Sequence, residues 1–303
     1  MTAGALVGNR DLLASCWTSA GDAAPDRGDE VSPVDLRTRI EAVAATGWQG
    51  LGLLHADLAV ARDTIGLPEL RRIIDGTGIT HVELEFLTWW WTTDERRAVS
   101  DERRALLLEA AEVLGARTIK VSPEEAGRPV DPARFAAEFD ALATQAGNAG
   151  TRVAIEFMPM TSLTTLQAGA DLVTAVGNRY GGLVVDIWHV HRGGTGYAEL
   201  ERVLPVEHVF VIELDDADEQ VVGTLWEDTK DRRRLPGQGV FDVPAFIAAV
   251  HRAGYRGPWG VEILSAEHRR LPVREGLTRA RTATLAALDA AESLVAPRAG
   301  SPG

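Results

Sequence analysis

The chain has 303 residues, of which 45% are hydrophobic, and its formal net charge at pH 7 is −13. A chain with this acidic balance lacks the positive surface that binds phosphate backbones, so we expect no nucleic-acid partner. No stretch approaches the roughly 18 consecutive apolar residues of a membrane span, so we also expect no insertion into a membrane.

The cysteine content and the first residues bear on the cellular compartment. The single cysteine, Cys16, excludes a disulfide within the chain and fits a reducing cytosol. We interpret it as a small buried hydrophobic residue rather than as a nucleophile. The first residues, MTAGALVGNRDLL, have no basic segment followed by an apolar one. We therefore expect no signal peptide and a cytoplasmic location.

Strand and helix signals alternate along the chain. Short runs rich in Val, Ile and Leu predict eight strands, at residues 12–17, 50–54, 79–87, 117–122, 152–157, 182–187, 208–214 and 258–263. Helical segments with ordinary start and stop signals separate these runs; one of them follows Ser32 and Pro33 and ends at Gly47. The last predicted helix covers roughly residues 274–293, and we expect a flexible tail at residues 294–303.

Eight strand–helix units without a Pro- and Gly-rich linker predict a single domain. We expect one (β/α)8 TIM barrel over residues 1–293. An open doubly wound sheet is the alternative, but no G-x-G-x-x-G motif follows the first strand.

The barrel prediction sorts the histidines, because active sites of such barrels lie at the carboxyl ends of the strands. His81 and His208 stand at strand starts and His251 within a helix, so we place these three away from the site. The candidates that remain all follow strand ends, and they are His55, His189, His191 and His268.

Four predicted strands in the second half of the chain end in a carboxylate. The runs VAIE, LVVD, VFVIE and WGVE close at Glu156, Asp186, Glu213 and Glu262. A charged residue at the end of a buried strand is costly unless it is paired or binds a cation. Four of them on successive strands predict a ring of oxygen ligands around one divalent metal ion. For Glu156 and Glu262 the alternative is a structural role, capping a loop or pairing with a basic residue.

Asp186 and His189 form a D-x-x-H motif where the sixth strand turns over the barrel mouth. Other strand-terminal carboxylates lie about one strand–helix unit before and after the motif, roughly 30 residues each. We therefore predict that Asp186 is a metal ligand and that His189 contacts substrate or acts as an acid or base. The alternative for His189 is that it supports a ligand or anchors the loop.

These residues resemble the sugar phosphate isomerase/epimerase superfamily with its xylose isomerase-like barrel. That family places a Glu, an Asp, a His or Gln, and a Glu at the ends of strands five to eight, around Mn²⁺, Mg²⁺ or a similar ion. The segment GQGVFDVPAFIAAVHRAGYRGPWGVEIL is similar to its closing unit, and the resemblance covers about residues 34–265 and is specific from residue 152. It implies that Glu156 and Glu262 both ligate the metal ion and move protons.

One position departs from the family pattern, because Glu213 stands where the family has His or Gln. If Glu213 is a ligand, four carboxylates surround one dication, which favours hard ions over Zn²⁺. We expect Mn²⁺, with Mg²⁺ or Co²⁺ as alternatives. Glu213 could instead face the substrate as a base, or the family position could correspond to Asp215 or Asp216.

Two residues on the third and fourth strands are further candidates. Glu85 shares one strand face with Glu83 and lies nearer the mouth, where it could bind substrate hydroxyls or form a structural ion pair. Lys120 ends the fourth strand. It could have a lowered pKa and act as a general acid or base, or it could pair with a neighbouring carboxylate.

Residues in the connections complete the candidate set. Trp90, in the run of three tryptophans at 89–91, could stack on a sugar; this run could also hold an aromatic group, pack within its loop or form a homo-oligomer interface. Arg192, in HRGGTGY, could bind an anion, and His55 is a substrate-binding candidate after the second strand. We interpret the basic stretches at 231–234 and 268–270 as solvated loops, either of which could reach a substrate anion.

These features predict a metal-dependent isomerase or epimerase acting on a sugar, keto-sugar or cyclitol through an enediolate-type intermediate. The alternative is a lyase, such as an inosose or dehydroshikimate dehydratase or a component that cleaves carbon–glycoside bonds. A nuclease like the barrel-shaped apurinic endonucleases is disfavoured, since those use a histidine-rich multimetal cluster, whereas this chain has seven histidines and a charge of −13. A non-catalytic binding protein is the remaining possibility.

Overall fold

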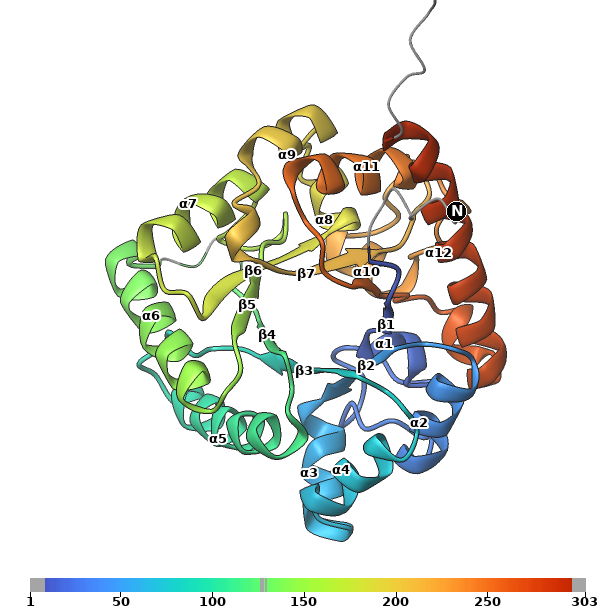
Figure 1. The fold of residues 1–303 in the computed structure, drawn as a ribbon. Helices are drawn as coiled ribbons and strands as arrows, with labels where there is room; N and C mark the ends of the chain where they lie inside the picture. Colours follow the sequence, from blue (N-terminus) through green and yellow to red (C-terminus); the bar gives the residue numbers. More distant parts are fainter. Residues whose placement is uncertain (1–8, 126–127, 129, 296–303) are drawn as a thin grey trace, which may run out of the picture.

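The strands form a closed parallel barrel. The computed structural model describes residues 9–125, 128 and 130–295, and its eight strands follow one another around the barrel in chain order (Figure 1). They are β1 (Leu12–Ala14), β2 (Gly50–Leu54), β3 (His81–Leu87), β4 (Thr118–Val121), β5 (Val153–Glu156), β6 (Gly181–Asp186), β7 (Val209–Leu214) and β8 (Trp259–Val261). Each strand overlaps its predicted range, and the predicted (β/α)8 TIM barrel is confirmed.

Long helices form the outer layer around the barrel, and some short helices in the connections lie inside this layer (Figure 1). The helices, long and short, are α1 (Cys16–Ser19), α2 (Leu36–Ala45), α3 (His55–Thr64), α4 (Leu67–Asp75), α5 (Arg96–Leu114), α6 (Pro132–Asn148), α7 (Leu166–Val176), α8 (Ile187–Arg192), α9 (Tyr197–Val203), α10 (Leu225–Asp231), α11 (Val243–Ala253) and α12 (Val273–Val295), with 3-10 turns η1 (Val206–His208) and η2 (His268–Arg270). The helix α12 continues two residues past its predicted end, and residues 296–303 of the predicted tail lie outside the described residues. Within residues 9–125, 128 and 130–295, none of the helices has both the length and the apolar character required to cross a membrane.

Most strand residues are apolar because both faces of the sheet are covered, the outer face by helices and the inner face by side chains of other strands. Parallel pairing sets the strand ends side by side, and Asp186 at the end of β6 lies opposite Glu213 of β7. At the other end of the barrel, His81 lies 3.1 Å from Asp11, and His208 Nδ1 lies 2.9 Å from the carbonyl oxygen of Gly181. Both histidines therefore lie at the strand starts, as predicted.

A buried ion pair connects α2 and α3 to the first two strands. Arg39 of α2 is fully buried and donates to Asp57 of α3 over 2.6 Å. Its guanidinium also donates to the Ser19 hydroxyl, 2.8 Å away, and to two carbonyl oxygens, those of Cys16 at 3.0 Å and Gly52 at 3.1 Å. One cation thus joins the segments that follow β1 with β2 and its following helix.

Candidate active site

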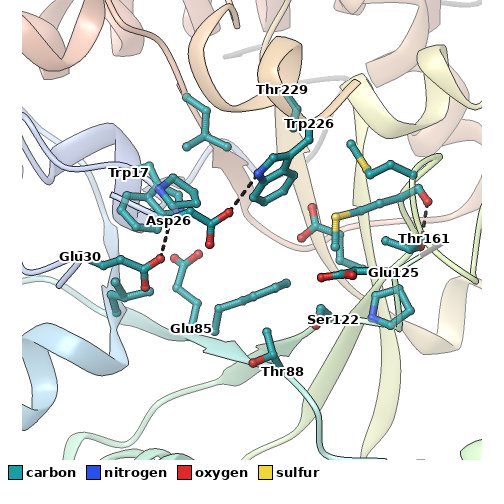
Figure 2. Close-up of a pocket in the computed structure, with 18 of the residues that line it drawn as sticks. Trp17, Asp26, Glu30, Glu85, Thr88, Ser122, Glu125, Thr161, Trp226 and Thr229 are labelled. Carbon is teal, nitrogen blue, oxygen red and sulfur yellow. Dashed lines mark hydrogen bonds between the residues drawn. The ribbon is translucent and has the colours of Figure 1, made fainter. Parts of the chain in front are cut away.

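A cavity of about 870 Å³ opens at the carboxyl ends of the strands (Figure 2). Its lining includes residues at the ends of several strands, among them Leu54 of β2 and Glu156 of β5, and Glu262 directly after β8. This is the end of the barrel at which the sequence predicts a site, and at which TIM-barrel enzymes carry their chemistry.

The four predicted carboxylates converge beside this cavity, and two of them, Glu156 and Glu262, line it. Glu156, Asp186, Glu213 and Glu262 each offer one oxygen atom, and these atoms all lie within 4.8 Å of one another. All four side chains are buried. We call this set the acid ring. His189 belongs to a second group with Glu156 and Asp186 that meets the same distance limit.

His189 lies beside the acid ring as a neutral side chain. Its Nε2 atom is 3.3 Å from Glu156 Oε1, and its Nδ1 atom has no hydrogen-bond partner among the described residues. Burial lowers the pKa of His189 to about 4, although Asp186 opposes this shift. An imidazole in this state carries one donor and one acceptor near pH 7.

Arg233 is the residue that sequence reasoning missed. It is buried, and its Nη1 atom contacts Asp186 and Asp215 and lies 3.2 Å from Glu262 Oε2. Arg233 belongs to the basic stretch at 231–234, which the sequence predicts to be a solvated loop. For Arg233 this interpretation is wrong, because its side chain is buried. The Arg233 amide donates to the Leu264 carbonyl oxygen over 3.0 Å, which holds this segment against the connection after β8.

Lys120 forms a second buried cation in the acid ring. Its Nζ atom lies 2.5 Å from Glu213, 3.5 Å from Glu85 and 3.6 Å from Glu262. Burial works against the charged form, but these carboxylates prevail and raise the pKa of Lys120 well above its ordinary value. The expectation of a lowered pKa is therefore wrong, and the alternative, pairing with a neighbouring carboxylate, is what the structure contains.

Glu213 is the carboxylate of β7 that faces the acid ring. Its Oε1 atom accepts from Lys120 and from the Ser15 hydroxyl, whereas Oε2 has no hydrogen-bond partner among the described residues. Asp215 instead pairs with Arg233. Asp216 accepts from the backbone amides of three residues in its own connection, and these are Ala217, Gly237 and Phe241. Its oxygen atoms are therefore engaged in holding that loop.

Around the acid ring, buried carboxyl groups outnumber buried cations. Among the described residues, six buried carboxylates gather here, and they are Glu85, Glu156, Asp186, Glu213, Asp215 and Glu262. The cations that contact them are Lys120 and Arg233. Burial, followed by the neighbouring carboxylates, raises the pKa of Glu156 well above its ordinary value, and burial and Glu213 do the same for Glu262.

The excess of carboxyl groups, the raised pKa values of Glu156 and Glu262 and the oxygen atoms that lack partners among the described residues fit a divalent cation, which would favour the ionised carboxylates. Within the described part of the chain, Glu156 Oε1, Glu213 Oε2 and Asp215 Oδ1 are buried without a hydrogen-bond partner. Buried carboxylate oxygens without partners are costly, and a bound cation would supply both the missing contact and a compensating positive charge. The residues present therefore fit the metal ion that the sequence predicts.

Glu85 reaches the cavity because a neighbouring residue is glycine. Its Oε1 atom accepts from the Cys16 amide over 2.9 Å, and its Oε2 atom faces Lys120. A Cβ atom at Gly52 would lie 2.7 Å from Glu85 Oε1, a distance shorter than Cβ atoms keep from non-bonded atoms in proteins. The same Cβ atom would lie 2.5 Å from the Cys16 backbone nitrogen, so a side chain at Gly52 would displace the Glu85 carboxylate, the Cys16 backbone or both.

Of the three other candidate histidines, His55 is the one that lines the cavity. It begins α3, and burial lowers its pKa to about 3, which leaves the ring neutral. His191 stacks on Phe241 with 4.1 Å between ring centroids, and His268 Nε2 lies 2.9 Å from the Thr18 carbonyl oxygen. The contacts of His191 and His268 are thus structural.

Arg192 and Trp90 do not line the described cavity. The Arg192 guanidinium donates to the carbonyl oxygens of Asp218 and Glu219 and to Asp228, so its donors hold the connection after β7. Trp90 is fully buried against Phe135, with 4.7 Å between ring centroids. The structure places both side chains away from the cavity, and we do not retain them as substrate-binding residues.

The core position of Trp90 leads to a stability prediction. Its Nε1 atom donates to the Ser122 carbonyl oxygen over 2.8 Å. Trp90→Phe should lower the free energy of unfolding by about 1–3 kcal/mol, because it leaves that buried carbonyl unpaired and removes packed volume. Urea unfolding measures the change, with Trp226→Phe as the control because Trp226 is 37% exposed. Equal losses in the two variants would contradict the buried role of Trp90.

The amino-acid sequence is similar to a family of known barrel proteins and to individual enzymes. The model of the xylose isomerase-like TIM barrel family matches residues 40–283. An inosose isomerase of Halalkalibacterium halodurans is 30% identical over 138 residues, which cover 45% of this chain and 48% of that protein. A 3-dehydroshikimate dehydratase of Pseudomonas aeruginosa is 28% identical over 246 residues, which cover 79% of this chain and 38% of that protein. The chain thus spans about half or less of the length of these curated relatives.

Solved structures share the fold. A structure described as IOLI protein with a bound zinc atom superposes with a TM-score of 0.79 at 20% identity, covering 92% of this chain and 98% of that one. An L-ribulose 3-epimerase superposes with a TM-score of 0.74 at 15% identity, covering 97% of this chain and 100% of that one. At these identities the likeness concerns the fold alone.

Proposed function

The chain belongs to the xylose isomerase-like TIM barrel family, and on this premise we propose that it is a divalent-metal-dependent isomerase or epimerase of a sugar, keto-sugar or cyclitol. The observation that carries the proposal is the acid ring, in which four buried carboxylates meet within 4.8 Å. The isomerase and epimerase relatives support the substrate class.

Glu156, Asp186, Glu213 and Glu262 would hold the ion, for which we keep Mn²⁺ as the first expectation and Mg²⁺ or Co²⁺ as alternatives. When bound, a divalent ion supplies Lewis-acid polarisation of a substrate carbonyl. The buried cations Lys120 and Arg233 would face the negative charge that develops as a neighbouring carbon loses its proton.

Glu156 and Glu262 are the proposed acid–base pair. Glu156 ends β5 and Glu262 directly follows β8, with β6 and β7 between these strands in the barrel, and both side chains line the cavity. One carboxylate would remove the proton beside the carbonyl group. Return of the proton to the neighbouring carbon gives isomerisation, and return to the opposite face of the same carbon gives epimerisation. His189, through its free Nδ1 atom, would contact a substrate oxygen.

A lyase is the second candidate. The dehydratase relative aligns with 79% of this chain, a longer stretch than the inosose isomerase does. The same proton removal followed by loss of a β-hydroxyl group gives dehydration, and loss of a carbon-linked aglycone would give cleavage of a carbon–glycoside bond. Both outcomes use the same acid ring.

Metal binding is the first test of the proposal. Protein stripped with EDTA should unfold at a higher temperature after Mn²⁺ is added, since an ion at 100 times its Kd stabilises the native state by about 2.7 kcal/mol. Differential scanning fluorimetry with Mn²⁺, Mg²⁺, Co²⁺ and Zn²⁺ measures the shift and ranks the ions. No shift with any ion would contradict the proposal and favour a non-catalytic binding protein.

Mass spectrometry of the reaction separates the two candidate activities. The metal-loaded protein would be incubated in D₂O with an inosose and with 3-dehydroshikimate. An isomerase or epimerase conserves the elemental composition and incorporates solvent deuterium at carbon, whereas a dehydratase releases water. The product mass therefore identifies the branch.

A further inference from the structure

The upper part of the cavity is lined by aromatic rings that the proposed proton transfers do not use. Trp17 lies in α1, Trp89 and Trp91 follow β3, and Trp226 lies in α10; Phe86 of β3 adds a fifth ring. Figure 2 shows Trp17 and Trp226 on the same side of the cavity, with Asp26 between them. Rings from three separate connections thus meet around one space.

Several of these rings are held in place by specific contacts. Trp226 Nε1 donates to Asp26 Oδ2 over 3.0 Å, which joins residues 200 positions apart in the sequence. Trp91 Nε1 donates to Glu124 over 3.1 Å. The backbone of Trp89 has a φ of 58°, in the left-handed region that residues other than glycine rarely adopt. Such a conformation persists only where the surroundings impose it, and it is common at ligand sites.

The size of the cavity exceeds what a single sugar ring requires. Pockets for drug-sized ligands measure roughly 300–1,000 Å³, and this cavity, at about 870 Å³, lies toward the upper end of that range. Of the acid ring, Glu156 and Glu262 line this cavity, and they are a small part of its lining. A monosaccharide bound there would leave the aromatic part unfilled.

The charge of the lining disfavours a phosphorylated substrate. Among the described residues, eight carboxylates line the cavity against two guanidinium groups, those of Arg103 and Arg233. Arg233 is already engaged by the acid ring. Even with one dication bound, the lining keeps an excess of negative charge, which repels an anionic group.

We propose that the substrate is a polyhydroxylated ring without negative charge that carries a bulky, planar apolar substituent such as an aryl group. The acid ring would bind the oxygens of the polyhydroxylated ring, and Trp17, Trp89, Trp91 and Trp226 would pack on the substituent, since flat apolar groups stack on aromatic faces. This inference rests on the proposed function, because it assumes that the sugar-like part binds at the acid ring.

Calorimetric titration of the metal-loaded protein with matched glycosides tests the inference. The probes are phenyl and methyl β-D-glucosides, the corresponding galactosides, and glucose 6-phosphate. In one or both pairs the phenyl glycoside should bind at least about 10-fold more tightly than its methyl partner, which corresponds to about 1.4 kcal/mol. Glucose 6-phosphate should bind more weakly than methyl glucoside.

Variants of Trp226 assign the preference to the aromatic part of the cavity. Trp226→Ala should remove most of the phenyl preference, whereas Trp226→Phe should keep most of it. Val222→Ala is the control, because Val222 precedes α10, is 50% exposed and does not line the described cavity. Circular dichroism of each variant checks that the fold is kept.

Three results would overturn the inference: no measurable binding of either phenyl glycoside, equal binding of phenyl and methyl partners, or tighter binding of glucose 6-phosphate. A phenyl preference that survives Trp226→Ala would overturn the assignment to these rings. The metal content of the same samples separates this inference from the proposed function. Retained metal without a phenyl preference rejects only the inference, and a phenyl preference without metal binding rejects the metal-dependent function.

Discussion

Glu156→Gln and Asp186→Asn should each lower the affinity for a divalent ion by about 100-fold or more and abolish metal-dependent turnover. Replacement of even an outer partner of a metal ligand typically costs 10–100-fold in affinity. Each of these changes removes one charged ligand and keeps the side-chain shape. The oxygen atoms concerned belong to a set of four that all lie within 4.8 Å of one another, so each variant leaves three charged ligands of this set.

Glu124→Gln is the matched control for these two variants. Glu124 is a buried carboxylate that lines the same cavity, but its Oε2 atom accepts from Trp91 and it lies outside the acid ring. Elemental analysis and titration with Mn²⁺ should give normal metal content for this variant. The wild-type affinity should also fall as the pH is lowered, since protons compete for carboxylate ligands. Full metal content in Glu156→Gln and Asp186→Asn would show that the ligand assignment is wrong.

The acid ring could be predicted because barrel geometry converts chain position into spatial position. Residues that close parallel strands meet at one rim of a barrel, so Glu156, Asp186, Glu213 and Glu262 could be expected together before any coordinates were known. The choice of Glu213 over Asp215 or Asp216 needed the structure. Strand alternation allows Asp215 to face inward as well, and only the contacts to Arg233 and to loop amides separate the three.

Of the two buried cations described at the site, Lys120 was predicted from the sequence and Arg233 was not. Arg233 belongs to a run of three arginines, and only the middle one is buried, because the bridge between Arg232 and Ser265 fixes which side chain turns inward. Lys120 was a candidate, but the direction of its pKa shift depends on how many carboxylates approach its Nζ atom. Of the tryptophans at 89–91, Trp89 and Trp91 line the cavity and Trp90 does not, a distinction that the sequence alone does not make.

Asp57→Ala should lower the free energy of unfolding by about 3–5 kcal/mol, the usual cost when one partner of a buried ion pair is removed. The Arg39 guanidinium is fully buried, and Asp57 is the only carboxylate that contacts it among the described residues. Urea unfolding measures the loss. Asp63→Ala is the matched control, because Asp63 lies on the same helix in an exposed pair with Arg62 and its removal should change little.

The double variant Arg39→Leu with Asp57→Ala separates the contribution of the ion pair to the free energy of unfolding from the cost of leaving Arg39 buried without a partner. Because it leaves no buried charge without a partner, the double variant should be more stable than Asp57→Ala alone. Equal losses in the free energy of unfolding for Asp57→Ala and Asp63→Ala would show that the buried ion pair does not stabilise the fold.

The Arg39 side chain is also linked to the position of Glu85. Its guanidinium donates to the carbonyl oxygens of Cys16 and Gly52, the two residues that set the position of Glu85. On the prediction that Glu85 binds substrate hydroxyls, loss of the pair should weaken substrate binding more than it changes metal content, because none of these contacts involves the four acid-ring carboxylates.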